Sequence, residues 1–213
     1  MSSPRANENG IYNNPYWYDN TYNAGAQDYT WMANCTTYAY GRSVEIAGGQ
    51  IDRNTIFGSG FPDAKNWYNN ALWTKSASKS DIREGDILCW GPGGGVGNFG
   101  HVAVVEKIDG DGKIWISQSH YNSQGVNQTR TYPSTTSKRY FEYGYYDTST
   151  DVIHVTYYYN SAGTFDYHYS TIYVPTFNGT IHNPYAGSGS SSIIPVLMLM
   201  KKRKERRSVR VRL

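Results

Sequence analysis

The apolar pattern of this chain changes its period once, and that change constrains the fold more than any other feature of the sequence. Apolar side chains recur at helical spacing between residues 33 and 47 and again over residues 63–72. From residue 87 onward the spacing becomes two, which indicates strands at 87–90, 101–108 and 113–119. The sequence therefore predicts two helices that precede a series of strands.

Turn signals join the expected strands into hairpins. The sequence Asp-Gly-Asp-Gly at 109–112 separates two of the strands, and Asp-Gly pairs favour tight hairpin turns. A further strand is expected at 140–146. Residues 152–159 and 165–174 alternate β-branched and aromatic side chains around the turn sequence at 160–163, so they predict a second hairpin. We interpret this C-terminal β-hairpin as an extension outside the main domain.

A chain of 213 residues accommodates one full-sized domain and additional segments. We expect an N-terminal arm at 1–14, the main domain at 15–148, a β-rich extension at 149–186, and a Gly/Ser linker with a short apolar and basic, flexible tail at 187–213. Residues 1–10 are polar, so no standard secretory leader is expected.

The C-terminal tail has an apolar part and a basic part. Its apolar run at 193–200 contains Pro195 and is far shorter than the roughly 20 residues that a membrane-spanning helix needs, so no transmembrane span is expected. Two interpretations stay open. The tail is either a docking peptide for a partner or an anionic membrane face, or a strand packed on the domain with a solvated basic end.

The charge of the chain is unevenly distributed. Residues 201–213 hold eight Lys or Arg and one Glu, a balance of +7, so the rest of a chain with net charge +3 carries −4. Nucleic-acid binding needs clustered basic side chains on the folded surface, and the main domain is therefore not expected to bind nucleic acid. Abundant glycine (22) and tyrosine (21) favour a β-rich protein with amphipathic side chains on its surface, which suits contact with polysaccharide.

Cys35 and His101 are the residues with the strongest chemical signal. Cys35 stands at the expected beginning of the first helix, and His101 opens an apolar strand. A cysteine attacks a carbonyl carbon as its thiolate, which a helix N-terminus and a nearby imidazolium both favour. Papain-like cysteine hydrolases have this layout, so we interpret Cys35 as a nucleophile and His101 as its proton-transfer partner. Cys89, within an apolar strand, is interpreted as a buried and inert thiol.

The imidazole also needs an acceptor on its other ring nitrogen, which fixes its tautomer. Alternation along the next strand places Gln118 and His120 on one face, beside His101. Either side chain can accept this hydrogen bond, and both stay open as the orienting group. Neither carries the negative charge of an Asp or a Glu.

The negative oxygen that forms during attack needs donors as well. The backbone N–H of Cys35 and the side chain of Asn34 are candidates for this oxyanion site, while Asn34 is equally suited to cap the helix. The glycine-rich run at 91–100 lacks the lysine and the following helix of a phosphate-binding loop. We interpret it as a flexible lip of the cleft, with a plain surface loop as the alternative.

These residues resemble the CHAP family, the cysteine, histidine-dependent amidohydrolases/peptidases of bacterial and phage cell-wall lysis. The resemblance covers about residues 15–145 and rests on four segments in order: NCTTYAYGR at 34–42, DAKNW at 63–67, GDILCW at 85–90 and GHVAVVE at 100–106. It implies a papain-like α+β fold, in which N-terminal helices pack on an antiparallel β-sheet. It also implies hydrolysis of peptidoglycan, either at the N-acetylmuramoyl-L-alanine amide or within the stem peptide or cross-bridge.

The chain departs from the family pattern at two places. A Glu-x-Asn pattern of the family corresponds here to Gln118 and His120. Some family members bind calcium through acidic residues just before the cysteine, where this chain has Asp28, so we expect no obligatory metal and no cofactor.

Because no standard secretory leader is expected, we predict a phage-encoded lysin, either an endolysin or a virion-associated enzyme. It would be located in the virion or in the host cytoplasm before lysis and would act on the bacterial cell wall. Its expected partners are peptidoglycan and, through the C-terminal tail, virion tail proteins. Two other functions stay open. One is a weakly active or inactive wall-binding or structural tail protein, and the other is a transpeptidase with the same cysteine chemistry.

Overall fold

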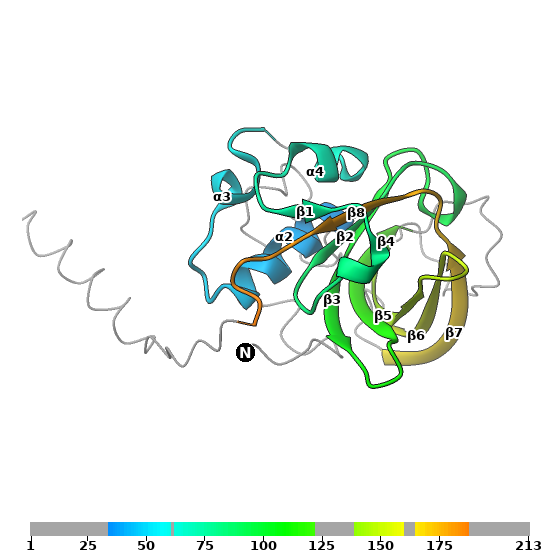
Figure 1. Cartoon of the computed structure of the whole chain (residues 1–213). Helices are drawn as coiled ribbons and strands as arrows, with labels where there is room; N and C mark the ends of the chain where they lie inside the picture. Colours follow the sequence, from blue (N-terminus) through cyan, green and yellow to red (C-terminus); the bar gives the residue numbers. More distant parts are fainter. Residues whose placement is uncertain (1–33, 61, 122–138, 160–164, 188–213) are drawn as a thin grey trace, which may run out of the picture.

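The chain folds as an α+β protein whose helices precede most of its strands (Figure 1). The figure shows a computed structural model, which describes residues 34–60, 62–121, 139–159 and 165–187. The helices are α2 (Cys35–Ile46), α3 (Arg53–Phe57) and α4 (Ala64–Asn70), and two 3-10 turns are η1 (Lys79–Asp81) and η2 (Gly94–Val96). The strands are β1 (Lys75–Ser76), β2 (Ile87–Trp90), β3 (His101–Ile108), β4 (Ile114–Tyr121), β5 (Arg139–Asp147), β6 (Val152–Tyr159), β7 (Phe165–Tyr173) and β8 (Phe177–Ile181).

All eight strands form one antiparallel sheet in the order β1-β8-β2-β3-β4-β5-β6-β7. From β2 to β7 the order follows the chain, as expected for strands joined by hairpins. β8 breaks this order because it lies between β1 and β2. β8, the last strand of the described residues, therefore covers the edge of β2 that β3 leaves open.

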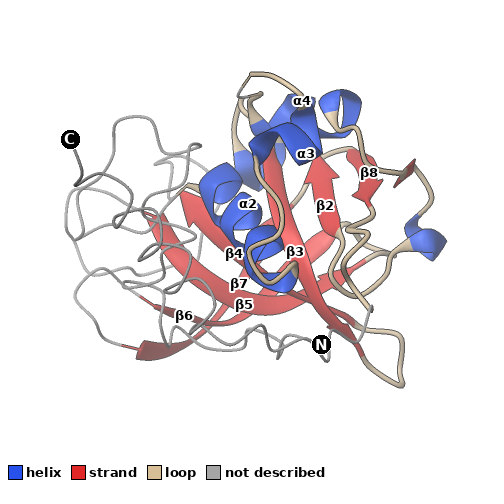
Figure 2. Ribbon diagram, turned by 90° about the vertical axis from the view of Figure 1, so that its left-hand side faces the viewer, coloured by secondary structure: helices blue, strands red, loops and turns tan. Residues whose placement is uncertain are grey.

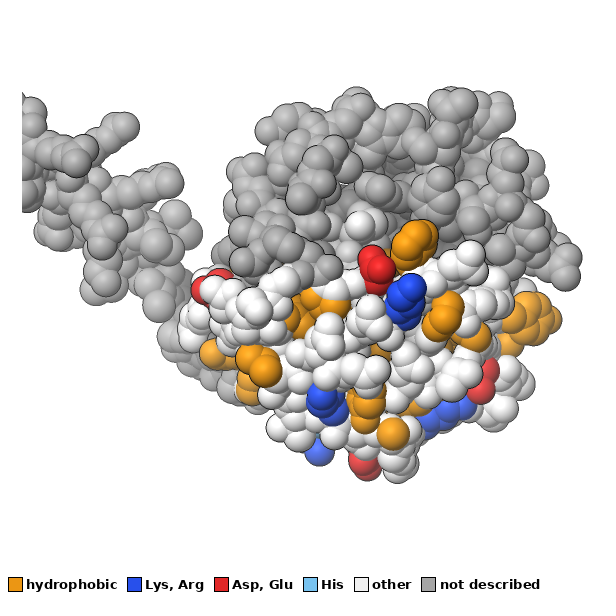
Figure 3. All heavy atoms as spheres, turned by 90° about the horizontal axis from the view of Figure 1, so that it is seen from above, with side chains coloured by type: hydrophobic (Ala, Val, Ile, Leu, Met, Phe, Trp, Pro, Cys, Tyr) orange, Lys and Arg blue, Asp and Glu red, His pale blue; other side chains and the backbone are white. Residues whose placement is uncertain are grey.

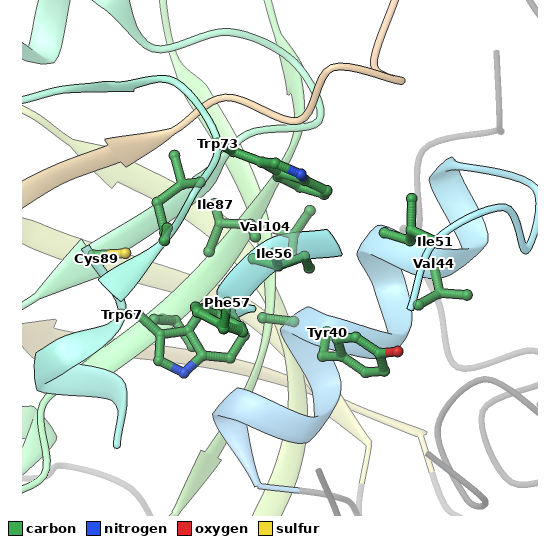
Figure 4. Close-up of a cluster of buried hydrophobic side chains, with 14 of the residues drawn as sticks. Tyr40, Val44, Ile51, Ile56, Phe57, Trp67, Trp73, Ile87, Cys89 and Val104 are labelled. Atoms are coloured by element: carbon green, nitrogen blue, oxygen red, sulfur yellow. The ribbon is translucent and has the colours of Figure 1, made fainter. Parts of the chain in front are cut away.

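The two faces of the sheet bury two different apolar clusters. The helices lie on one face (Figure 2), and side chains of α2, α3 and α4 pack there against Ile87, Cys89 and Val104 (Figure 4). The alternate residues of the same strands, including Leu88 and Val105, point into a second cluster. That cluster also contains Ile172 of β7, so the sheet curls until its far strands face β2.

The structure confirms the predicted order of helices before strands and several of the predicted strand boundaries. The expected helices at 33–47 and 63–72 are α2 and α4, and the expected strands at 87–90 and 101–108 coincide with β2 and β3. α3 was not expected, although Asp52 and Thr55 form a capping box at its beginning. Its five residues are too few to produce a clear apolar period.

Residues 152–181, which the sequence suggested as an extension, form strands of the same sheet. β6 pairs with β5, β7 pairs with β6, and β8 pairs with β2. β6 and β7 form the expected hairpin, and their described apolar side chains Ile153, Val155 and Ile172 are buried in the second cluster. The expected N-terminal arm at 1–14, the turn at 160–163 and the C-terminal tail from 188 lie outside the described residues.

A buried polar network attaches α2 to the sheet. The guanidinium of Arg42 donates from Nε and Nη2 to the two carboxylate oxygens of Glu106 in β3, at 3.0 and 2.8 Å. Glu106 also accepts from Ser117 Oγ at 2.5 Å, and Ser117 accepts from Tyr38 Oη at 2.8 Å. Burial opposes the charge of Arg42, yet Glu106 raises the pKa of Arg42 above its ordinary value. The guanidinium of Arg42 therefore stays protonated near neutral pH.

Replacing Arg42 with methionine should lower the free energy of unfolding by about 3–5 kcal/mol, because it takes away the cation that faces a buried carboxylate. Glu45→Gln is the matched control, since Glu45 bonds the same guanidinium from a side chain that is 22% exposed. That control should cost less than about 1 kcal/mol. Urea unfolding of both variants measures the difference. Equal losses in the free energy of unfolding would contradict the inference that Arg42 contributes mainly through Glu106 and not through Glu45.

Candidate active site

Cys35 is the first residue of α2 and is half-buried. Asn34 caps the helix: its Oδ1 accepts from the backbone N–H of Thr37 and from Thr36 Oγ1, both at 2.8 Å. Asn34 has extended backbone angles, as an N-cap does, and the helix begins at the next residue. The thiol therefore lies in the first turn, where the unpaired N–H groups of a helix favour a thiolate.

The contacts of α2 determine which end of the sheet Cys35 reaches. Tyr38 is bound at the middle of the β3–β4 pair, and Arg42, one turn later, reaches Glu106 further along β3. α2 therefore runs beside β3 in the same direction. The first turn of α2, which carries Cys35, therefore lies towards the beginning of β3, where His101 is located.

A second set of contacts places Cys35 at the same level of the sheet. Cys35 packs against the apolar cluster that contains Cys89 of β2 and Val102 of β3, which are cross-strand partners. Burial raises the pKa of the Cys89 thiol well above its usual range, and the nearby Cys35 raises it further. Val102 is the residue next to His101, so the thiol and the imidazole are carried to one end of the sheet.

His101 is held by its neighbours on β2 and β4. Its ring stacks on that of Trp90, with centroids 5.9 Å apart and planes inclined by 22°. Its Nε2 lies 2.8 Å from Oε1 of Gln118, and the residue is 2% exposed. One ring nitrogen of His101 is thus engaged by a side-chain amide.

A carboxylate lies behind this amide. Gln118 Nε2 donates to Oε2 of Glu142 at 2.6 Å, and both residues are 1% exposed. Gln118 in β4 and Glu142 in β5 are directly opposite each other in the ladder. The residue on the imidazole is an uncharged amide, and the carboxyl side chain of Glu142 lies one residue further from His101.

The other expected site residues have different outcomes. His120 lies in β4 opposite Tyr140, and its side chain is outside the described residues. Asn34 acts as the helix cap, and its Oδ1 is used for that purpose. A donor role for Asn34 towards an oxyanion stays a prediction, as do the catalytic roles of Cys35 and His101.

Sequence analysis missed Glu142. Its only local signal was a charged residue within an otherwise aromatic strand at 140–146. Gln118 lies opposite Glu142 only in one register of β4 and β5. The composition of the sequence does not determine that register.

The glycine-rich segment before His101 is packed against the sheet. Gly91 N–H donates to the carbonyl of Thr176, and a Cβ at Gly94 or Gly95 would meet the backbone or side chains of β7 at 2.6 Å. Glycine is needed at these positions because the loop approaches β7 closely. The packed loop differs from the flexible lip that the sequence suggested.

A cavity of about 630 Å³ lies away from these groups. Its lining includes Trp73, Asp86 and His182, and Asp86 directly precedes β2, whereas Trp90 ends β2 opposite His101. The length of β2, roughly 13 Å at 3.3 Å per residue, separates the cavity from His101. Within the described residues, no cluster of three His, Cys, Asp or Glu side chains has the geometry of a metal site.

The described surface offers no concentrated charge in the view from above, where acidic and basic side chains are dispersed among polar and apolar ones (Figure 3). No helix in the part of the chain that the structure describes is both long enough and apolar enough to cross a bilayer.

Comparison with known proteins finds a family model and several relatives. Residues 16–120 match the model of the CHAP domain. It is 32% identical over 124 residues to the "Probable autolysin SsaALP" of Staphylococcus aureus, covering 58% of this chain and 40% of that protein. It is also 32% identical over 99 residues to an N-acetylmuramoyl-L-alanine amidase domain-containing protein of the same species, covering 46% of this chain and 15% of that protein.

A third relative is the staphylococcal secretory antigen SsaA of Staphylococcus epidermidis, 30% identical over 122 residues, which are 57% of this chain and 42% of that protein. The chain thus spans less than half the length of these curated relatives. The crystal structure of Ly7917 aligns with 70% of this chain and 90% of its own at 19% identity, and its TM-score of 0.29 is too low to carry an argument.

The two thiols should react differently with iodoacetamide in the native protein near neutral pH. We expect one adduct, at Cys35, because Cys89 is fully buried and its raised pKa keeps it protonated. Peptide mass spectrometry after labelling measures this, and labelling in denaturant should add the second adduct. Modification of native Cys89 at the rate of Cys35 would contradict the assignment.

Gly100→Ala should disturb the beginning of β3, because its Cβ would lie 2.6 Å from the Trp90 carbonyl and 2.8 Å from Lys65 N. Gly97→Ala is the matched control: both glycines have φ of +72°, but a Cβ at Gly97 meets nothing within 4 Å. The clash should cost about 1–3 kcal/mol beyond the backbone strain that both variants share. Denaturant unfolding of both variants checks this, and equal losses would refute the close packing before His101.

Proposed function

We propose that this protein is a peptidoglycan hydrolase that cleaves an amide bond of the wall peptide with Cys35 as its nucleophile. The observation that carries the proposal is the engaged imidazole: His101 is bound through Nε2 by Gln118, at the end of the sheet towards which the thiol-bearing first turn of α2 points. The match of residues 16–120 to the CHAP domain model and relatives named autolysin and amidase support the substrate class.

In the proposed reaction, the thiolate of Cys35 attacks the carbonyl carbon of the amide. The helix N-terminus favours the anionic sulfur, and the backbone N–H of Cys35 and the side chain of Asn34 are the proposed donors to the oxyanion. His101 gives its proton to the leaving amine as the carbon–nitrogen bond breaks, which leaves a thioester. Water, deprotonated by His101, then hydrolyses the thioester and restores the thiol and imidazole pair.

The finer assignments are part of the proposal. The scissile bond is either the N-acetylmuramoyl-L-alanine amide or a peptide bond of the stem or cross-bridge, since the same chemistry serves both. Phage origin and attachment to a virion through the C-terminal tail remain predictions, because residues 188–213 lie outside the described part of the chain and the relatives described above are bacterial proteins.

Digestion of purified Gram-positive cell walls by wild type and Cys35→Ala, followed by mass spectrometry of the released fragments, tests the proposal. Wild type should release new amine and carboxyl ends, and Cys35→Ala should reduce that release by at least about 10³-fold, as loss of a catalytic nucleophile does. Cys89→Ala is the control and should retain activity, because that thiol is buried in the core.

The products separate this proposal from its alternatives. Equal release by wild type and Cys35→Ala would refute the cysteine mechanism. Binding to walls without release of any fragment would indicate a wall-binding protein, and new cross-links without new free ends would indicate a transpeptidase.

A further inference from the structure

Glu142 is a buried carboxylate that the proposed reaction does not use. It is 1% exposed in β5 and accepts from Gln118 Nε2 at 2.6 Å, while Oε1 of the same amide lies 2.8 Å from His101 Nε2. A hydrogen bond of this length to a carboxylate is typical of a strong, charge-assisted contact. The three side chains form a continuous chain across β3, β4 and β5.

The direction of this chain follows from what each group can donate or accept. An ionised carboxylate only accepts, so Glu142 requires the NH₂ of Gln118 to face it. The amide oxygen must then face His101, where it also only accepts. Nε2 of His101 must therefore carry a hydrogen, which leaves Nδ1 as the nitrogen that takes up and releases the proton used in catalysis.

Without the carboxylate, this direction would not be determined. A side-chain amide presents a donor at one end and an acceptor at the other, and it can turn by 180° within the same space. With its NH₂ towards His101, the amide would favour the opposite tautomer, with the hydrogen on Nδ1. Gln118 alone therefore cannot specify the tautomer of the imidazole.

We propose that Glu142 is a positioning residue that sets the tautomer of His101 through Gln118. Its effect on catalysis rests on the proposed function, whereas its effect on the tautomer does not. The family's Glu at the position of Gln118 would place a carboxylate directly on the imidazole. Here an amide on β4 and a carboxylate on β5 together provide the acceptor that faces the imidazole.

The decisive variant is Glu142→Gln, which keeps the size of the side chain. It replaces a carboxylate, which can only accept hydrogen bonds, with an amide that can also donate them. Two-dimensional ¹H–¹⁵N spectra of the histidine rings distinguish a protonated from an unprotonated ring nitrogen. With Cys35 replaced by alanine, so that no thiolate holds both protons on the imidazole, His101 should be protonated at Nε2 alone, and adding Glu142→Gln should make the Nδ1–H tautomer appear. In wall digestion with Cys35 intact, kcat should fall by about 10- to 100-fold, as for outer partners of functional histidines, with KM nearly unchanged.

The exchanged pair Gln118→Glu with Glu142→Gln should restore the tautomer and most of kcat. Glu at 118 can accept from both His101 Nε2–H and the amide at 142, so the order of donors and acceptors is re-established. A purely structural role for Glu142 predicts no such rescue.

Asp86→Asn is the matched control, because Asp86 is also 1% exposed and also faces a histidine, His182, at 2.9 Å. It should lower stability and leave the His101 signals and kcat of the folded protein unchanged. An unaltered His101 tautomer in Glu142→Gln, or no rescue by the exchanged pair, would overturn the proposal. If wild type itself releases no wall fragments, the proposed function fails, while the ring spectra still decide the role of Glu142.

Discussion

The attachment of α2 to the sheet depends on the bidentate contact between Arg42 and Glu106. α2 is buried over most of its length, and an apolar helix face can slide or rotate with little loss of contact area. The fork of the guanidinium on a carboxylate has one good geometry, so it fixes both the height and the rotation of the helix. Cys35, two turns earlier, receives its position from this contact.

The imidazole is fixed by a separate set of strands. His101 is bound by Gln118 of β4, which is in turn bound by Glu142 of β5, and its ring lies on Trp90 of β2. Four neighbouring strands therefore hold one ring. The helix positions the thiol and the sheet positions the base, and the two arrangements meet where α2 packs on β3 and β4.

The sequence predicted those features that depend on local pattern. β2 and β3 begin and end where alternation begins and ends, and α2 begins after Asn34 because that side chain satisfies N–H groups that the helix leaves open. β8 escaped prediction because it contains Gly179 and Asn178, which are poor strand formers, and because its partner β2 lies some ninety residues earlier. The choice between Gln118 and His120, and the presence of Glu142, required a register that only the folded sheet defines.

The position of β8 also affects the order in which the protein folds during synthesis. Thr180 binds Asp86 across 94 residues of chain, and β2 has an open edge until β8 arrives. Pairing over such a distance forms late, since it must first overcome the entropy of closing a long loop. During synthesis the sheet that carries His101 therefore stays unfinished until residue 181 has left the ribosome. The candidate site is complete only after nearly all the described sequence has been translated.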